Sequence, residues 1–374
     1  MGRDYDRTTD GDASSGQGLE LEYRRFSLPL RHPLETAHGT IHSRDGFLVR
    51  LTDGDDAGLG EATPLEGWTE PLEECDRGLE RARRALEAVK ENEGETTRES
   101  VVSAMLDAVD ETTAARCGLS LAVLDLEAVR SSWPLYRQLG TEGRVARVPA
   151  NATVGDGTPD ETVAATREAV DRGFDCCKLK AGIRSVEEDV ERVRRTREAV
   201  GSDVELRVDA NGAWDFGEAE QAVEAFAGLG VAVLEQPLPA GALEGHAELR
   251  GRGVAIALDE GLLDHGVDAI CSSNSADAIV LKPMALGGID IALDLAAWVR
   301  ELGIVPIVTT TIDGVVARTG AVHLAAAIPD VPACGLATGG LLERDLGRDP
   351  VPFEKGAAVV PQAKGLGVSG VWEE

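Results

Sequence analysis

The stretch DCCKLKAGIRSVEEDVERVRRTREAVGSDVELRVDAN (residues 175–211) reads as a strand, a helix and a second strand, and it sets the pattern for most of the chain. Its first apolar run ends at Lys180 and its second at Asp209. Three further apolar runs end at Glu235, Asp259 and Lys282. These charged residues lie 29, 26, 24 and 23 positions apart, which fits one strand and one helix per interval. The stretch therefore predicts a repeated strand-helix unit with a charged residue at each strand end.

The same alternation covers residues 143–338. We expect strands at VARVPANATV, DCCKLKA, VELRVDA, VAVLEQP, VAIALDE, AIVLKP, IVPIVTT and ACGLAT. Helices are expected at about 159–172, 186–200, 216–228, 242–251, 262–272, 288–302 and 314–328. Eight near-continuous apolar strands with seven intervening helices predict an α/β fold in which a parallel TIM-like barrel lies inside a helical ring. The alternative is an open doubly wound sheet, because alternation alone does not show closure.

Three other segments flank the predicted barrel. Residues 1–18 are polar and rich in glycine, and they predict a disordered tail. Residues 19–142 begin with short antiparallel strands and continue with three amphipathic helices, which indicates a separate α+β domain. The last segment, 339–374, is rich in turn residues and is expected to pack back on that first domain.

Acidic residues outnumber basic ones along the whole chain. The 66 Asp and Glu residues against 37 Lys and Arg give a formal net charge of −29. Nucleic acid and anionic membranes are therefore excluded as partners. The same excess is typical of proteins kept soluble at high salt, so we expect a halophilic source rather than an ordinary acidic cytoplasmic enzyme. The melting temperature measured against KCl separates the two, since destabilisation by molar salt contradicts the halophilic interpretation.

Cysteine usage and hydropathy point to the cytoplasm. Six cysteines are scattered without C-x-x-C spacing, so we expect them to be reduced. No apolar run approaches the length of a membrane span, and the N-terminus has no apolar signal-peptide core. The sequence leaves a homo-oligomer open.

The acidic strand ends predict a metal site. In a parallel barrel the C-terminal ends of the strands converge on one mouth, which would bring Asp209, Glu235 and Asp259 together. Three adjacent carboxylates repel one another unless a cation compensates, and Mg²⁺ suits three oxygen ligands with open positions for substrate. Asn211 and Glu260 follow closely in sequence and are expected to orient the ligands. The alternative for any single carboxylate is a salt-bridged surface group.

Lysines complete the predicted site. Lys178 and Lys180 lie two apart on a strand, so their side chains share one face. If that face is the barrel interior, a nearby cation would lower the lysine pKa values toward the range of a general base. Lys282 lies four strands later, across the barrel, so two lysines would flank a bound substrate. A solvent-facing lysine pair is the alternative.

The motifs at the strand ends resemble those of the enolase superfamily, specifically of its muconate lactonising enzyme subgroup. They are K-L-K (178–180), V-D-A-N (208–211), L-E-Q-P (234–237), D-E (259–260) and L-K-P (281–283). The resemblance implies an N-terminal α+β cap over a (β/α)7β barrel, with one Mg²⁺ on Asp209, Glu235 and Asp259. It implies that Lys180 removes the proton next to a substrate carboxylate through a metal-stabilised enediolate. The seventh strand lacks the His-Asp pair of the mandelate racemase branch.

Peripheral residues favour one activity of the subgroup. The segment GEATPLEGWTE (60–70), the helix RCGLSLAVLDLEA (116–128) and Arg207 are similar to features of o-succinylbenzoate synthases. That resemblance implies dehydration of 2-succinyl-6-hydroxy-2,4-cyclohexadiene-1-carboxylate in menaquinone biosynthesis, with Lys282 against the ring-bearing intermediate. Thr311 and Asp313 are candidate substrate contacts, although the synthases often have glutamate in a serine-rich segment there.

Four other functions share the same residues. Dipeptide epimerases characteristically carry Asp-x-Asp at the end of the eighth strand, which GLATGGLLERD does not clearly supply. Muconate cycloisomerisation and N-acylamino acid racemisation use the same lysine and metal core, so the core cannot choose among them. A barrel that only binds its ligand is the non-enzyme alternative, but none of the five core residues is missing. The expected partner is a small-molecule carboxylate, and no other cofactor is predicted.

Overall fold

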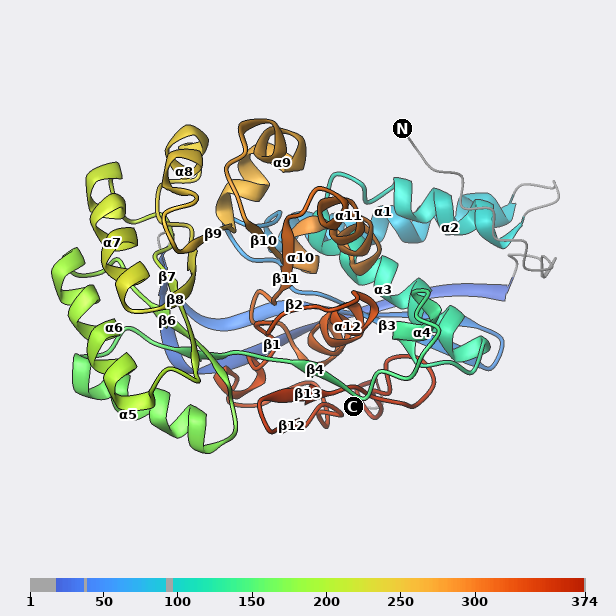
Figure 1. The fold of residues 1–374 in the computed structure, drawn as a ribbon. Helices are drawn as coiled ribbons and strands as arrows, with labels where there is room; N and C mark the ends of the chain where they lie inside the picture. The colour runs from blue at the N-terminus through green and yellow to red at the C-terminus, as the bar shows by residue number, and fades with distance from the viewer. Residues whose placement is uncertain (1–17, 37–38, 92–96, 373–374) are drawn as a thin grey trace.

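A computed structural model describes residues 18–36, 39–91 and 97–372 (Figure 1). The predicted disordered tail falls almost entirely on residues 1–17, which lie outside the described residues. No helix in the described part of the chain is long and apolar enough to cross a membrane.

The N-terminal part, called the cap below, consists of an antiparallel sheet and three helices. Its strands are β1 (Leu19–Thr36), β2 (Gly39–Asp53) and β3 (Asp56–Ala62), in the order β1-β2-β3. Its helices are α1 (Leu72–Glu91), α2 (Arg98–Asp107) and α3 (Thr113–Arg130). The first two strands are longer than their apolar runs predict, because pairing continues beyond an irregularity between Pro29 and Leu34.

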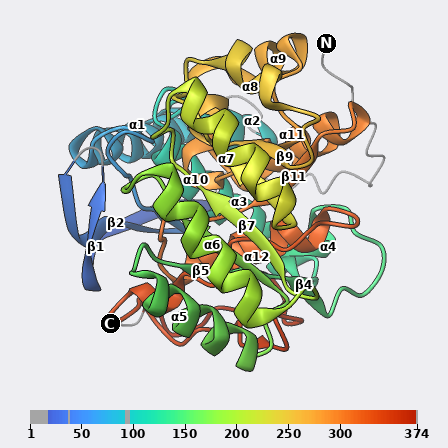
Figure 2. The same ribbon diagram turned by 60° about the vertical axis from the view of Figure 1, so that its left-hand side comes forward.

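The rest of the chain forms the predicted succession of strands and helices. The central sheet contains β5 (Ala152–Val154), β6 (Cys176–Lys180), β7 (Glu205–Asp209), β8 (Val231–Glu235), β9 (Ala255–Leu258), β10 (Ala278–Leu281) and β11 (Val305–Val308). The helices that cover it are α5 (Pro159–Asp171), α6 (Val186–Val200), α7 (Phe216–Gly228), α8 (Leu243–Leu249), α9 (Glu260–Ser273), α10 (Pro283–Leu286), α11 (Ile289–Glu301) and α12 (Val315–Ala327). Neighbouring strands are parallel and follow chain order. Figure 2 shows α5, α6 and α7 side by side on the outside.

The two edges of this sheet meet across residues 334–335. Cys334 forms a parallel bridge with Ala150, and Gly335 forms one with Thr309. The expected eighth strand is therefore present as two isolated bridges rather than as a regular strand. The expected first strand is divided, since β4 (Arg147–Pro149) pairs instead with β13 (Ala357–Val359), which also pairs with β12 (Phe353–Glu354). The (β/α)7β barrel with an N-terminal α+β cap is confirmed.

Local sequence explains where the first barrel helices begin. Thr158, Ser185 and Asp215 each accept a hydrogen bond from the backbone N–H of a glutamate three residues later. The carboxylate of that glutamate in turn accepts one from the backbone N–H of the capping residue. These capping boxes satisfy backbone N–H groups that the first helical turn leaves free. They fix α5, α6 and α7 directly after the loops at the barrel mouth.

The cap and the barrel share a core. Met284 of α10 and Ala317 of α12 belong to the apolar cluster of the cap, among residues of β1–β3 and α1–α3. Glu61 of β3 is fully buried and accepts hydrogen bonds from the N–H groups of Gly314 (2.6 Å), Val316 (3.1 Å) and Ala317 (3.0 Å). A carboxylate at this helix N-terminus complements the helix dipole. The cap is thus attached directly to the segment that follows β11.

The C-terminal segment contacts both parts. Glu343 donates its N–H to Pro29 O at 2.8 Å, and Leu366 donates its N–H to Asp125 of α3 at 2.6 Å. The ring of Trp372 lies under the guanidinium groups of Arg24 and Arg50. The same segment also supplies β12 and β13 to the small sheet with β4.

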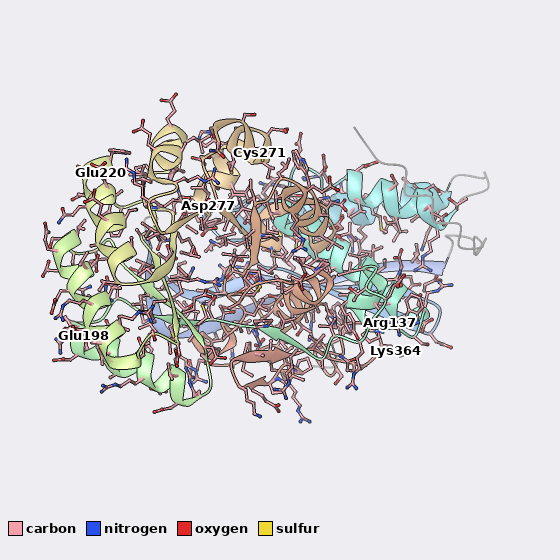
Figure 3. All side chains as sticks on the ribbon, in the orientation of Figure 1. Arg137, Glu198, Glu220, Cys271, Asp277 and Lys364 are labelled. Carbon is pink, nitrogen blue, oxygen red and sulfur yellow. The ribbon has the colours of Figure 1, made fainter. Side chains whose placement is uncertain are left out.

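Charged side chains project from the outer faces of the barrel helices. Figure 3 shows Glu198 on α6 and Glu220 on α7 pointing outward. Their side chains are 62% and 43% exposed, respectively. All six cysteines are unpaired, as expected.

A buried histidine makes stability depend on pH. His323 of α12 is fully buried; its Nδ1 accepts from Tyr136 N at 3.2 Å and its Nε2 donates to Leu366 O at 3.1 Å. Burial lowers the pKa of His323 to about 4. The unfolded chain therefore takes up a proton between pH 6.5 and pH 4 that the folded chain does not, and stability present above pH 6.5 is lost as the pH falls.

His323→Gln removes this titration while keeping a donor and an acceptor. We expect the parent to lose about 2 to 3 kcal/mol more unfolding free energy than the variant between pH 7 and pH 4.5. Urea unfolding at the two pH values measures the difference. An equal loss in both proteins contradicts the prediction.

Candidate active site

The charged strand ends meet at the C-terminal mouth of the barrel. Lys178 and Lys180 lie on β6, and Lys180 pairs in register with Asp209 of β7, which pairs with Glu235 of β8. Asp259 directly follows β9 and Lys282 directly follows β10. The three carboxylates are at most 3% exposed. The sequence thus identified five neighbouring strand ends that the fold brings together.

Each carboxylate is paired with a lysine. Lys178 Nζ lies 3.0 Å from Asp209 Oδ2 and 2.7 Å from Glu235 Oε1. Lys180 Nζ lies 2.6 Å from the same Asp209 oxygen. Lys282 Nζ lies 2.6 Å from Asp259 Oδ2. The ammonium groups therefore supply the counter-charge for the carboxylates in this conformation.

These contacts shift the pKa values in opposite directions. Burial alone would raise the pKa of Asp209, but the ammonium groups of Lys178 and Lys180 outweigh it and bring that pKa well below its usual range. Glu235 has a pKa raised to about 7, first by burial and then by the charge of Asp209, with Asp259 adding to it. One site thus contains a carboxylate held ionised and another that resists ionisation.

Between these carboxylates the pKa of Lys178 shifts upward. Burial lowers the pKa of Lys178, but the charges of Asp209 and Glu235 outweigh burial, and the net shift is upward. Lys178 bridges two carboxylates in this conformation, which favours its charged form. The expected lowering of the lysine pKa values depends on a cation bound at the carboxylates, and it stays a prediction.

Asn211 and Glu260 extend this network of hydrogen bonds. Asn211 Oδ1 accepts from Lys180 Nζ at 2.7 Å, and its Nδ2 donates to Glu260 Oε1 at 3.1 Å. The backbone N–H of Asn211 donates to Asp209 Oδ1 at 3.1 Å. Asn211 adopts φ 46°, a conformation that asparagine tolerates better than most residues. It therefore connects the base candidate, one carboxylate and Glu260.

Three other predicted site residues, Arg207, Thr311 and Asp313, form hydrogen bonds outside this network of lysines and carboxylates. Arg207 is buried two residues before Asp209, and it donates to Glu205 Oε1 at 2.6 Å and to Ala333 O at 2.8 Å. It thus ties β7 to the segment that closes the barrel. Thr311 donates to Asp313 Oδ1 at 2.5 Å, and both residues are buried. Their hydrogen bonds to each other fold the segment after β11 inward.

The cap contributes a residue whose contact the sequence did not reveal. Trp68 lies in the loop after β3, held in a turn by hydrogen bonds from its N–H and that of Thr69 to Leu65 O. Lys282 Nζ lies 3.3 Å from the centroid of the Trp68 ring, a cation-π contact. The only sequence signal was the aromatic residue in the segment 60–70.

Gln236 was also missed. It is fully buried directly after Glu235, and its Oε1 accepts from the N–H groups of Asp259 and Gly261, both at 3.1 Å. Its Nε2 donates to Leu238 O at 2.9 Å. Gln236 therefore fixes the backbone of Asp259 from the neighbouring strand. Its place directly after a charged strand end was the available signal.

A narrow hollow with no room for a water molecule lies between the cap loop and the barrel. It is lined by Trp68, Asp259, Lys282 and the apolar residues Leu262, Leu263, Val280, Ala285 and Leu286. Typical ligand pockets start at about 300 Å³. The cap loop therefore lies close against the barrel mouth in this structure.

The donor set suits a hard divalent cation. Asp209, Glu235 and Asp259 offer carboxylate oxygens, and the pKa of Glu235 is raised first by burial and then by the nearby charges of the other two. Within the described residues, no three acidic, histidine or cysteine side chains converge closely enough to coordinate one ion in this conformation. The chemistry of the residues fits Mg²⁺, while lysine contacts take up part of their oxygens.

A barrel with carboxylates and lysines at successive strand ends, under an α+β cap, defines a class of barrel enzymes. A family model described as enolase C-terminal domain-like matches residues 161–373, and the chain belongs to the enolase superfamily. A second model, the MenC N-terminal domain, matches residues 20–109 in the cap.

Solved structures and sequence relatives agree with this family. The substrate-liganded L-Ala-D/L-Glu epimerase from Bacillus subtilis has a TM-score of 0.83 at 26% identity, over 94% of this chain and 98% of that one. The dipeptide epimerase from Enterococcus faecalis, complexed with Mg and L-Leu-L-Tyr, has a TM-score of 0.80 at 27% identity, over 94% and 99%. The o-succinylbenzoate synthase from Thermobifida fusca is 37% identical over 210 residues, which is 54% of this chain and 63% of that protein.

Proposed function

We propose that this protein is an o-succinylbenzoate synthase, a carbon-oxygen lyase that dehydrates 2-succinyl-6-hydroxy-2,4-cyclohexadiene-1-carboxylate. The observation that carries the proposal is the match of the cap to the MenC N-terminal domain, because the cap supplies Trp68 to the barrel mouth. The 37% identity to the Thermobifida fusca synthase supports it. The product, o-succinylbenzoate, is a menaquinone precursor.

Lys180 is the base in this proposal. Asp209 and Asn211 hold its ammonium group at 2.6 and 2.7 Å, while the side chain remains 34% exposed at the mouth. The neutral amine takes the proton from the ring carbon next to the carboxylate. The resulting ammonium then gives a proton to the departing hydroxyl, so that water leaves and the ring becomes aromatic.

Lys282 lies on the other side of the mouth, under Trp68. Its ammonium group would face the electron-rich ring of the reacting substrate, where a cation-π contact is favourable. The Trp68 ring occupies this face in the present structure, at 3.3 Å. The contact of the Trp68 ring with Lys282 therefore indicates where the ring of the substrate would lie in this proposal.

Asp209, Glu235 and Asp259 would hold one Mg²⁺, the ion present in solved relatives from the same superfamily. When bound, Mg²⁺ supplies positive charge opposite the negative charge that develops on the substrate carboxylate. Asn211 would keep Asp209 oriented through its backbone N–H, and Gln236 would keep Asp259 in place.

Dipeptide epimerisation is the second candidate. The epimerases from Bacillus subtilis and Clostridium acetobutylicum are 26% and 28% identical over 94% and 92% of this chain. A dipeptide carries a free ammonium group that needs a carboxylate partner. Residues 336–341 (Leu-Ala-Thr-Gly-Gly-Leu), where the barrel closes, contain none. Chloromuconate cycloisomerases match to a similar extent, for example that of Delftia acidovorans at 27% identity over 91% of this chain, so muconate cycloisomerisation remains a third candidate. The solved N-succinyl Arg/Lys racemase from Bacillus cereus is 23% identical and supports only the shared fold.

Parallel assays on one preparation test the proposal. With Mg²⁺, we expect the cyclohexadiene substrate to be aromatised, followed by ultraviolet absorbance, and Lys180→Ala to abolish the reaction. A dipeptide library in D₂O, followed by the loss of α-proton signals, tests the second candidate. Dipeptide exchange without aromatisation overturns the synthase assignment. Inactivity on both substrates also overturns it and leaves muconate cycloisomerisation, N-acylamino acid racemisation and ligand binding without catalysis.

A further inference from the structure

Beneath the mouth, a buried arginine holds the backbone of the proposed base. Arg192 of α6 is 1% exposed, and its NH1 donates to Lys180 O at 2.9 Å. The same nitrogen donates to Asp189 Oδ1 at 2.7 Å, and Asp189 is fully buried. Asp189 Oδ2 in turn accepts from Gly182 N at 2.8 Å. Arg192 and Asp189 therefore bind the main chain at two points, the carbonyl group of Lys180 and the N–H group of Gly182.

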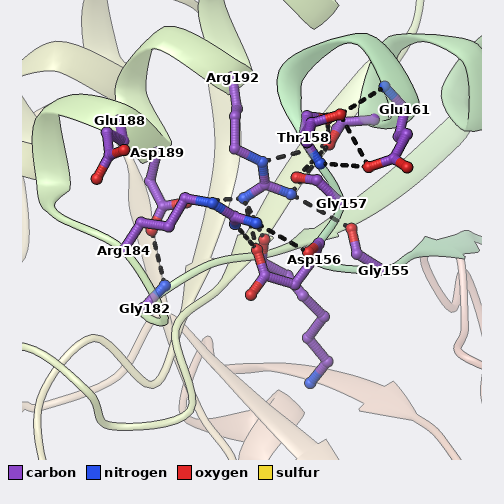
Figure 4. A network of polar contacts seen from close by, with 12 residues as sticks. Gly155, Asp156, Gly157, Thr158, Glu161, Gly182, Arg184, Glu188, Asp189 and Arg192 are labelled. Atoms are coloured by element: carbon purple, nitrogen blue, oxygen red, sulfur yellow. Dashed lines mark hydrogen bonds and ion pairs between the residues drawn. The ribbon is translucent and has the colours of Figure 1, made fainter.

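Other contacts of Arg192 reach the neighbouring strand end. Its NH2 donates to Gly155 O at 3.3 Å, in the loop after β5, and its Nε and NH2 donate to Thr162 Oγ1 at 3.2 and 3.1 Å. Asp156 Oδ1 lies 3.2 Å from Arg192 NH1 and also pairs with Arg184 of the loop after β6. Figure 4 shows Arg192 and Arg184 converging on Asp156.

The backbone conformation of the loop after Lys180 allows the hydrogen bond between Gly182 and Asp189. Gly182 adopts φ 94°, and a Cβ there would lie 2.6 Å from Ala213 Cβ and 2.9 Å from Ala210 O. Only glycine fits a backbone with this conformation so close to the next strand-helix loop. The Gly182 N–H is therefore fixed from both sides, by Asp189 and by the chain after Asp209.

Stability alone does not account for an ion pair in this place. Two fully buried charges must be desolvated, and apolar residues of similar volume often stabilise a protein as well or better. The contacts of Arg192 converge instead on the carbonyl groups of Lys180 and Gly155, which end adjacent barrel strands. A guanidinium group, with five donors in a rigid plane, can hold several carbonyl groups at once.

We propose that Arg192, together with Asp189, is a positioning residue for Lys180, and that it sets where the base points by fixing the backbone on both sides. This inference rests on the proposed role of Lys180. It does not depend on which of the candidate substrates is used. A displacement of the base by about 1 Å is enough to cost about 100-fold in rate.

Arg197 provides a matched control on the same helix. At the far end of α6 it donates to four backbone carbonyl groups: Leu229 O, Gly201 O, Val204 O and Gly230 O. Like Arg192, Arg197 binds backbone carbonyl groups through its guanidinium group, but it lies at the end of α6 that is farther from Lys180. Arg197→Lys should lower the thermal midpoint with kcat within about twofold of the parent, because it does not touch the base.

Two conservative variants keep the test independent of unfolding. Arg192→Lys keeps the charge but loses the planar set of donors, and Asp189→Asn keeps the shape but turns an N–H group toward either Arg192 or Gly182. We expect kcat to fall about 30-fold or more in each, with KM within about threefold, at temperatures where both are folded. In Arg192→Ala, low-millimolar guanidinium should restore part of kcat, and it should restore none in Lys180→Ala.

The outcomes separate this inference from the proposed function. Values of kcat in Arg192→Lys and Asp189→Asn within twofold of the parent overturn the positioning role. A loss of kcat in Arg197→Lys as large as that in Arg192→Lys also overturns it, because the effect would then follow stability alone. If the parent turns over none of the substrates, or Lys180→Ala remains active, the role of Lys180 is wrong and the inference falls with it.

Discussion

Replacing Lys180 with alanine is expected to lower kcat by about 10³- to 10⁴-fold and to leave the fold intact. Lys180 is the lysine at the mouth whose side chain is one-third exposed, whereas Lys178 is bridged between Asp209 and Glu235. The Lys180 amine is therefore the more accessible of the two to a substrate proton. Without it, abstraction next to a carboxylate has no base.

The fold should survive because Asp209 keeps other partners. Lys178 Nζ remains 3.0 Å from Asp209 Oδ2, and the Asn211 N–H remains on Oδ1. The circular dichroism spectrum and the thermal midpoint should therefore stay close to those of the parent. Lys364→Ala, at an exposed residue of the C-terminal segment, is the control and should keep full activity.

A second variant distinguishes the charge of Lys180 from its basicity. Lys180→Arg preserves a positive charge beside Asp209 but cannot be deprotonated near neutral pH. We expect it to be as inactive as the alanine variant. Activity of Lys180→Ala within tenfold of the parent refutes the assignment of the base.

Dialysis against EDTA is expected to abolish turnover, and Mg²⁺ is expected to restore it. The reason is electrostatic, since Asp209, Glu235 and Asp259 lie buried at one barrel mouth and Glu235 has a pKa raised to about 7. A divalent cation offsets this repulsion and allows all three to ionise. Full activity in the metal-free protein contradicts the metal site.

A thermal measurement tests the ligands without relying on activity. Mg²⁺ at 100 times its Kd should stabilise the parent by about 2.7 kcal/mol, seen as a higher thermal midpoint at constant ionic strength. Glu235→Gln should lose most of this increase, because an amide carries no charge for the ion. Glu198→Gln, on the exposed face of α6, should keep it. Equal increases in all three proteins would place Mg²⁺ elsewhere.

Much of the barrel could be predicted because its signals are local. Helical periodicity and capping boxes at Thr158, Ser185 and Asp215 depend only on neighbouring residues. The eighth strand was harder, because the segment around Cys334 closes the barrel through isolated bridges with no regular ladder. The apolar residues of this segment predicted where the eighth strand lies but not how short its pairing is.

In the candidate active site, too, some features could be predicted from the sequence and others could not. Charged residues at strand ends predicted which side chains share the mouth, since register follows from the fold. The pairing of Lys178 with two carboxylates, and its raised pKa, could not be predicted because they depend on side-chain distances. Trp68 was missed as a contact of Lys282 because it comes from the cap, some 200 residues away in the chain.

The shared core described above has a consequence for how such proteins diversify. Met284 and Ala317 complete the apolar interior of the cap, and Glu61 of the cap satisfies the first turn of α12. A cap transplanted from a relative would have to match these three positions as well as its own interior. Cap and barrel must therefore change together during evolution, and new substrate preferences should arise by exchanges within the loop around Trp68 rather than by recombination of whole domains.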